Sequence, residues 1–154
     1  MKSASRPLDF EGIIAFAVAR EEEAAAGYAA LMTAAETPGL KDLFRELRDE
    51  ETDHKRRLEG LDPAGAGALG PAAVEDLGIT DGLRAEPTHP DMSFQDALIF
   101  AARKEEQAVR LYTGLAAEAT RAGDRKLFEF LAGREKLHKL KLETEYDKRV
   151  LAED

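Results

Sequence analysis

The most constraining feature of this chain is that it contains one stretch of sequence twice. Residues 9–61 (the first repeat) match residues 93–145 (the second repeat) at 18 of 53 positions, at a constant offset of 84 residues and without an insertion. An alignment this regular predicts that both stretches form the same structural unit. Several identities, such as Phe44 with Phe128, are ordinary core residues, so packing alone explains them.

The repeated unit has the sequence pattern of a helical hairpin. Apolar residues recur every three or four positions, which is the period of an α-helix, and strong helix formers dominate. Pro38 suits the first position of a helix, and Ser93 suits a helix cap, with Asp96 three residues on. Residues 122–124 predict a turn, and no strand pattern is present. We therefore expect an all-α fold with helices at about residues 9–36, 38–59, 93–121 and 124–152.

A long linker of different composition separates the two repeats. Residues 60–92 are rich in glycine and proline and predict a loop, with one short helix near residues 71–77. A helix of about 28 residues is about 42 Å long, and a linker of this length can cross that distance when extended. We therefore expect one domain in which the third helix begins at the opposite end from the end of the second. The expected architecture is a four-helix bundle of two hairpins related by a pseudo-two-fold axis.

Packing does not explain the charged residues that the two repeats share on their apolar stripes. Each repeat has one glutamate in its first helix and a Glu-x-x-His in its second, where the spacing of three places both side chains on one face. The rise per residue puts the two glutamates of each hairpin at nearly the same height. The shared residues are Glu21 with Glu105, Glu51 with Glu135, and His54 with His138. If the hairpins pack together, four carboxylates and two imidazoles converge on the bundle axis.

The charge of such a cluster must be balanced. Four buried carboxylates without compensation are strongly unfavourable, and some of them would take up protons. Two divalent cations neutralise them, and the two imidazoles complete the ligand shell. Oxygen-rich ligation with two imidazoles favours iron or manganese over structural zinc, although zinc can bind adventitiously. Iron in this setting would couple its own oxidation to the reduction of dioxygen or peroxide.

This pattern, one glutamate from each of two helices and Glu-x-x-His from the other two, resembles the di-metal carboxylate bundles of the ferritin-like family. The segments REEEAAAGY and KEEQAVRLY, with the internal duplication, resemble the rubrerythrin branch most. The resemblance covers residues 9–146 and implies a ferritin-like fold that binds two iron ions. The implied ligands are Glu21, Glu51, His54, Glu105, Glu135 and His138. It also implies that Tyr28 and Tyr112 lie beside the ligand carboxylates, whereas the competing interpretation makes them ordinary core residues.

Two features depart from rubrerythrins. Rubrerythrins commonly have a cysteine-rich rubredoxin domain, but this chain has no cysteine, so we expect an external electron-donor protein. The additional glutamate that many rubrerythrins have one turn after the third-helix ligand is replaced by Ala108. The remaining six ligands are the symmetric set found in bacterioferritins.

The resemblance implies an oxidoreductase of the peroxidase or ferroxidase type that acts on peroxide or dioxygen. Two other interpretations fit the residues: an iron-binding or iron-handling protein without catalysis, and a structural bundle whose metal site has decayed. The missing electron-transfer module favours the iron-binding protein without catalysis. Retention of all six ligands disfavours the structural bundle with a decayed metal site. The resemblance also implies a homodimer.

The overall charge and composition limit the partners of this chain. A net charge of −9 argues against binding to nucleic acid or to an anionic membrane surface. No segment has the length of a transmembrane helix or the flanks of a secretory signal, so a cytoplasmic protein is expected. The charged neighbours of the ligands, Glu22, Glu23, Glu50 and Glu106, are interpreted as surface charges, and His89 is interpreted as a loop residue.

Overall fold

The computed structural model describes residues 10–62 and 92–153. These residues form four helices and no strand: α1 (Phe10–Ala34), α2 (Pro38–Glu59), α5 (Phe94–Glu118) and α6 (Ala122–Glu153). Over these two ranges, the predicted all-α fold with four helices is confirmed. None of the described helices has an apolar stretch long enough to cross a membrane. The short helix predicted near residues 71–77 and the loop residue His89 lie outside the described residues.

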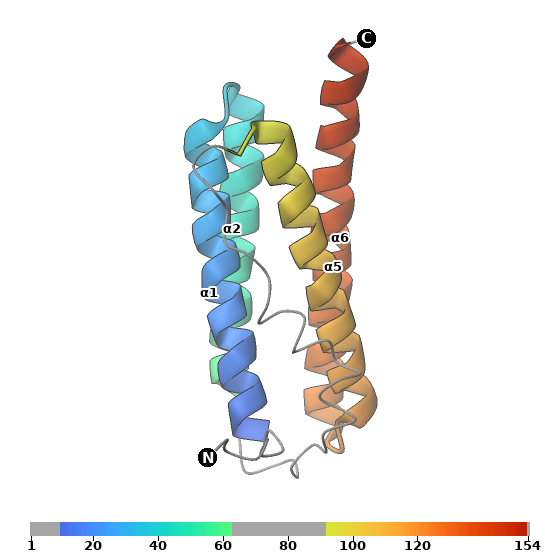
Figure 1. The fold of residues 1–154 in the computed structure, drawn as a ribbon. Coiled ribbons are helices and arrows are strands. Elements are labelled where there is room, and N and C mark those ends of the chain that lie inside the picture. Colours follow the sequence, from blue (N-terminus) through green and yellow to red (C-terminus); the bar gives the residue numbers. More distant parts are fainter. Residues whose placement is uncertain (1–9, 63–91, 154) are drawn as a thin grey trace, which may run out of the picture.

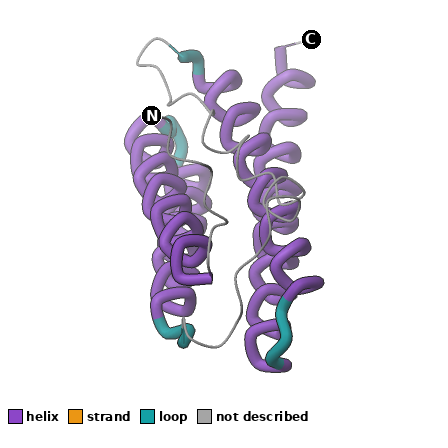
Figure 2. The backbone as a smooth tube through the Cα atoms, turned by 60° about the horizontal axis from the view of Figure 1, so that its bottom comes forward, coloured by secondary structure: helices purple, strands orange, loops and turns teal. Residues whose placement is uncertain are grey.

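The four helices lie side by side as two antiparallel hairpins (Figure 1). α1 packs closely against α2, and α5 packs closely against α6, whereas the hairpins face each other over a wider spacing. α2 ends at the lower end of the bundle and α5 begins at its upper end, so these two helices run in the same direction (Figure 1). The second hairpin therefore starts at the opposite end from where the first stops, as the long linker predicts. Figure 2 shows the two pairs of helices from a second direction.

Side chains in the turns cap two of the helices. Thr37 Oγ1 accepts a hydrogen bond from the backbone N–H of Leu40 at 3.2 Å, and Pro38 lies in the first turn of α2. Ser93 Oγ accepts a hydrogen bond from the backbone N–H of Asp96 at 3.0 Å. These caps satisfy N–H groups that have no partner within the helix. They explain why α2 and α5 begin where the sequence predicts.

The turn between α5 and α6 lies earlier than the sequence predicts. α5 ends at Glu118 instead of near residue 121, and α6 begins at Ala122 instead of residue 124. Residues 122–124 therefore form the first turn of α6. Asp124 stabilises this start, because its carboxylate lies at the positive end of the helix and accepts a hydrogen bond from Arg121 Nε at 3.0 Å.

Two apolar clusters fill the interior of the bundle, one toward each end. The lower cluster joins the starts of α1 and α6 to the ends of α2 and α5, and its buried residues include Ile13, Leu58, Leu115 and Phe128. The upper cluster joins the opposite ends of these helices, and its buried residues include Leu31, Phe44, Leu98 and Leu142. Full burial of each such side chain stabilises the fold by about 1.5–3 kcal/mol. The layer between the two clusters is therefore held in place from both sides.

Candidate metal centre

The layer between the two apolar clusters contains buried charged side chains from all four helices. α1 and α5 each supply one glutamate, and α2 and α6 each supply a Glu-x-x-His pair. At most 1% of each residue is exposed: Glu21, Glu51, His54, Glu105, Glu135 and His138. The structure thus brings together all six residues that the sequence singles out.

The six residues form two overlapping groups, in each of which one ligand atom per residue lies within 4.8 Å of the others. The His54 group contains Glu21, Glu51, His54 and Glu135. The His138 group contains Glu51, Glu105, Glu135 and His138. Glu51 and Glu135 belong to both groups, so their carboxylates lie between two possible cation positions. Each group could hold a metal ion.

Both imidazoles turn their Nδ1 atoms toward the carboxylates. His54 Nδ1 lies 3.1 Å from Glu135 Oε1, and His138 Nδ1 lies 3.0 Å from Glu51 Oε1. The two rings stack, with centroids 5.8 Å apart and an angle of 9° between their planes. Each imidazole therefore has its closest carboxylate in the other hairpin, and neither hairpin completes a group by itself.

The inward-facing polar atoms of this cluster lack hydrogen-bond partners among the described residues. Both oxygens of Glu51 and of Glu135, and the Nδ1 atoms of both histidines, are buried and unpaired. The same is true of Oε2 of Glu21 and of Glu105. Buried polar atoms in proteins almost always have a partner, so unpaired ligand atoms that face one another fit bound cations. Carboxylate and imidazole ligands together suit iron, manganese or zinc.

Without a cation, protons balance part of the charge of this cluster. Burial and the charge of Glu135 raise the pKa of Glu105 to about 7. The same causes raise the pKa of Glu51 well above its ordinary value and raise that of Glu21. Burial also acts on Glu135, but the approach of His138 and other donors outweighs it and lowers the pKa of Glu135. Burial opposes the charge of His138, yet its contacts with Glu105 and Glu135 raise its pKa to about 10.

Each of the two predicted tyrosines reaches across to a glutamate of the other hairpin. Tyr28 Oη donates a hydrogen bond to Glu105 Oε1 at 2.9 Å, and Tyr112 Oη donates one to Glu21 Oε1. Burial and the nearby carboxylates raise the pKa of both hydroxyls well above 10, so they stay protonated. Each glutamate therefore has one oxygen held by a tyrosine and the other oxygen unpaired and facing the cluster.

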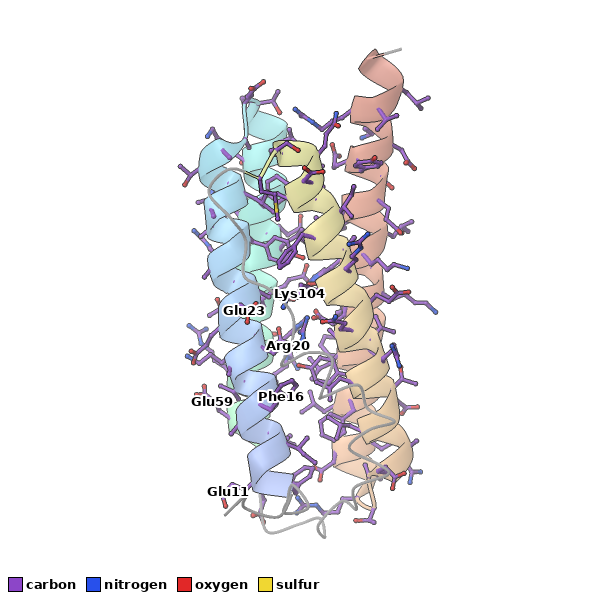
Figure 3. The ribbon with its side chains drawn as sticks, in the orientation of Figure 1. Glu11, Phe16, Arg20, Glu23, Glu59 and Lys104 are labelled. Atoms are coloured by element: carbon purple, nitrogen blue, oxygen red, sulfur yellow. The ribbon has the colours of Figure 1, made fainter. Side chains whose placement is uncertain are left out.

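Arg20 is a buried cation that the sequence reasoning missed. Its side chain lies between α1 and α5 (Figure 3) and is 10% exposed. Nη2 donates a hydrogen bond to the backbone carbonyl of Lys104 at 2.6 Å, and Nη1 lies 3.8 Å from Glu135 Oε2. Burial opposes its charge, but the carboxylates of Glu21 and Glu105 raise its pKa, so the guanidinium offsets part of the negative charge. A signal exists in the sequence, because Arg20 aligns with Lys104 and both directly precede a repeated glutamate.

Glu50 is not the surface charge that the sequence predicts. Its side chain is 22% exposed, and Oε2 lies 3.3 Å from His138 Nε2. Oε1 accepts hydrogen bonds from Arg134 Nε, at 2.8 Å, and from Arg134 Nη2. Burial raises the pKa of Glu50, but Arg134 and His138 outweigh burial and lower it. The prediction differs from the structure because Glu50 lies on a face of α2 that packs against α6. The periodicity of α2 alone does not show which helix lies next to that face.

The other three flanking glutamates are exposed, as the sequence predicts. Each forms an ion pair with a lysine of a neighbouring helix: Glu22 with Lys55 at 2.9 Å, Glu23 with Lys104 at 3.2 Å, and Glu106 with Lys139 at 3.6 Å. Figure 3 shows Glu23 and Lys104 above Arg20. Exposed pairs of this kind contribute at most about 1 kcal/mol each, so they do not define the buried cluster.

A cavity of about 560 Å³ lies between α1 and α5 and reaches the buried cluster. Its lining includes small residues of both helices, such as Gly27 and Ala101, and it also includes Tyr28 and Glu105. Its volume is within the range of small-molecule sites. A small molecule in this cavity would therefore lie beside the hydrogen bond from Tyr28 to Glu105.

Comparison of the chain with family models, with curated proteins and with solved structures gave no match. The function must therefore be inferred from the chemistry of the buried cluster and from the repeat that builds it. The described residues establish a four-helix fold in which buried glutamates and histidines could hold metal ions.

Proposed function

We propose that this chain is a ferritin-like, rubrerythrin-like di-iron oxidoreductase that reduces peroxide or dioxygen with electrons from an external donor protein. The observation that carries the proposal is the buried cluster of four carboxylates and two imidazoles whose inward-facing atoms are unpaired. Two divalent cations would balance the four carboxylate charges, whereas Arg20 supplies only one positive charge. The donor set suits iron, and it also suits manganese.

In this proposal each of the two groups would hold one iron ion. Glu51 and Glu135 would contribute to both positions, since they belong to both groups. Glu21 and His54 would complete one position, and Glu105 and His138 would complete the other. Two ferrous ions held there would supply two electrons, enough with two protons to reduce one molecule of hydrogen peroxide to two molecules of water.

The chain's own residues would orient the ligands and control access to them. Tyr28 and Tyr112 each hold one oxygen of a glutamate and leave the second oxygen for a cation. Their hydroxyls remain protonated and continue to donate these hydrogen bonds. The apolar clusters on both sides keep bulk water out of the layer. The cavity between α1 and α5 offers a small oxidant a route to Tyr28 and Glu105.

Contacts between equivalent positions of the repeats support the ferritin-like part of the proposal. Three contacts join a residue to its own counterpart 84 residues away: His54 with His138, Glu50 with Arg134, and Arg20 with the backbone of Lys104. Equivalent residues of two copies meet each other when they lie near the axis that relates the copies. We therefore propose a pseudo-two-fold axis that passes through the metal layer, between the two hairpins.

The test of this function is anaerobic loading of the metal-free protein with ferrous iron, followed by stopped-flow absorbance on mixing with peroxide or dioxygen. The proposal predicts ferric absorption in the near ultraviolet, and continued peroxide consumption when a reduced donor such as rubredoxin is supplied. Glu135→Ala is expected to abolish both, because Glu135 belongs to both groups. Glu106→Gln is the matched control, since it removes an exposed carboxylate beside Glu105. Iron-loaded protein that neither oxidises its iron nor consumes peroxide would contradict the oxidoreductase.

One observation favours a second candidate function, which is iron binding or iron handling without turnover. The chain has no cysteine, so it carries no thiolate-bound iron that could pass electrons to the centre. Under this alternative, the wild-type protein binds iron but shows no peroxide consumption with any reduced donor. The stopped-flow experiment separates the two functions, because only the oxidoreductase consumes peroxide repeatedly.

A further inference from the structure

The two halves of the candidate centre have matching ligands but different surroundings. Position 50 of the first repeat corresponds to position 134 of the second, and these positions hold Glu50 and Arg134. The two side chains meet, since Glu50 Oε1 accepts hydrogen bonds from the Arg134 guanidinium. The first repeat therefore has a carboxylate at the position where the second repeat has a guanidinium. Because of this difference, the two histidines have different neighbours.

The outer nitrogen of His138 faces the carboxylate of Glu50. His138 is fully buried, and its Nε2 lies 3.3 Å from Glu50 Oε2, while its Nδ1 faces the cluster at 3.0 Å from Glu51 Oε1. Nε2 and Glu50 Oε2 are both buried, and neither has a hydrogen-bond partner among the described residues, so their 3.3 Å approach brings together two otherwise unpaired atoms. The guanidinium of Arg134 holds the opposite oxygen of Glu50 and so fixes the direction of its carboxylate.

Within the part of the chain that the structure describes, no corresponding carboxylate pairs with the outer nitrogen of His54. In the described part of the chain, the carboxylates paired with His54 are Glu21, Glu51 and Glu135, and each of them approaches Nδ1. The His54 ring instead forms a T-shaped contact with the Phe130 ring, with centroids 6.2 Å apart and an angle of 80° between the planes. The Arg57 guanidinium lies over the same ring, 4.9 Å from its centroid.

A carboxylate behind a metal-binding histidine has a defined effect. It accepts the proton of the outer nitrogen, which fixes the neutral tautomer with its lone pair toward the metal and makes that nitrogen a stronger ligand. Among residues 10–62 and 92–153, only His138 has a carboxylate at its outer nitrogen. We propose that Glu50 is a positioning residue that makes the His138 group the tighter of the two metal positions. This inference rests on the metal binding proposed above and adds that the two positions are unequal.

The test is a titration of metal-free protein with Co²⁺, followed by the visible absorption of the bound ion. Wild-type protein is expected to bind two ions in two resolved steps. Glu50→Ala is expected to weaken the tighter step by about 10–100-fold, which is the usual effect of losing such a partner, and to leave the weaker step unchanged. Glu106→Ala is the matched control, because Glu106 also neighbours a proposed ligand but is exposed. The circular dichroism melting curve of each metal-free variant reports whether it folds.

Double variants assign the affected step to one histidine. His138→Ala should remove the same step that Glu50→Ala weakens, so adding Glu50→Ala to His138→Ala should cause no further loss. Adding Glu50→Ala to His54→Ala should still weaken the remaining step. Glu50→Gln keeps a hydrogen-bond acceptor and should recover part of the lost affinity, which a purely structural role would not predict.

Two results would overturn the inference. One is an equal loss of affinity in both steps of Glu50→Ala, or no loss in either. The other is a further loss when Glu50→Ala is added to His138→Ala. Wild-type protein that binds no Co²⁺ would instead refute the metal centre itself, so the failures of the two proposals are distinguishable.

Discussion

At the scale of single residues, the two carboxylate oxygens of Glu21 and of Glu105 have different surroundings. Tyr28 and Tyr112 hold Oε1 of Glu105 and of Glu21, and the remaining oxygens face the cluster unpaired. The tyrosine and its glutamate always belong to different hairpins. These hydrogen bonds therefore tie the hairpins together and orient the two proposed ligands at the same time.

Tyr28→Phe tests that role. The variant leaves a buried carboxylate oxygen without its donor, so the unfolding free energy of the metal-free protein should fall by about 1–3 kcal/mol. Urea unfolding measures this change, and Tyr146→Phe, which alters a partly buried tyrosine outside the cluster, is the control. An unchanged unfolding free energy in Tyr28→Phe would show that the hydroxyl does not stabilise Glu105.

The protonation of the cluster predicts an opposite pH dependence for the metal-free and metal-bound proteins. The folded protein keeps the proton of Glu105 up to pH about 7, whereas the unfolded chain loses it near pH 4.5. The contribution of Glu105 to the unfolding free energy therefore decreases as the pH rises from 4.5 to about 7. His138 contributes stability that is present below pH 6.5 and lost as pH rises toward about 10. The lowered pKa of Glu135 acts only at the acid end, because its contribution is complete above pH 4.5.

Metal-free protein should therefore become less stable between pH about 5.5 and about 8, because the folded state binds more protons than the unfolded state. With saturating Co²⁺ the dependence should reverse, because metal competes with protons for the same atoms. Urea unfolding at both pH values, with and without Co²⁺, measures both slopes. Parallel slopes would mean that the protons and the metal do not share a site.

At the scale of helices, the hairpins are fixed by caps as well as by apolar stripes. Thr37 and Ser93 accept hydrogen bonds from the first turns of α2 and α5. Replacing Thr37 by alanine should lower the unfolding free energy by about 1 kcal/mol. Thr113→Ala is the control, since this exposed threonine lies inside α5, far from its capped start, and alanine is the better helix former there. A loss in Thr113→Ala as large as that in Thr37→Ala would contradict the capping role.

The helices and the six clustered residues were predictable because both follow from spacing. A period of three to four residues defines the helices, and Glu-x-x-His in two aligned copies marks one face of α2 and of α6. The start of α6 was mispredicted, although the repeat contains the answer: Ala122 aligns with Pro38, the first residue of α2. Glu50 could not be placed from spacing, because its environment depends on Arg134 and His138 of a helix 84 or more residues away.

At the scale of the whole molecule, the route by which an oxidant reaches the candidate metal centre can be tested separately from metal binding at that centre. The cavity between α1 and α5 reaches Tyr28 and Glu105, and a Cβ atom added at Gly27 meets nothing within 4 Å. Gly27 lines this cavity, so Gly27→Leu should narrow it, and it should slow the reaction of the iron-loaded protein with peroxide while leaving the iron content unchanged. Stopped-flow absorbance and metal analysis measure the two effects.

Gly133→Leu is the matched control for the cavity variant. Gly133 also lies in a helix with open space at its Cβ, but it does not line the cavity between α1 and α5. Both variants replace a helical glycine by a better helix former, which favours the helix by up to about 1 kcal/mol. Equal reaction rates in the two variants would mean that the oxidant reaches the centre by another route.

Taken as one unit, the molecule has two hairpins, neither of which completes a candidate metal position alone, and we propose that together they hold two metal ions. The most direct measurement is the metal content of anaerobically iron-loaded protein after removal of free metal, for wild type, for Glu51→Ala and for the exposed-site control Glu22→Ala. Wild type and Glu22→Ala should each retain two iron ions per chain, and Glu51→Ala should retain fewer, because Glu51 belongs to both groups. Equal iron content in wild type and Glu51→Ala would contradict the claim.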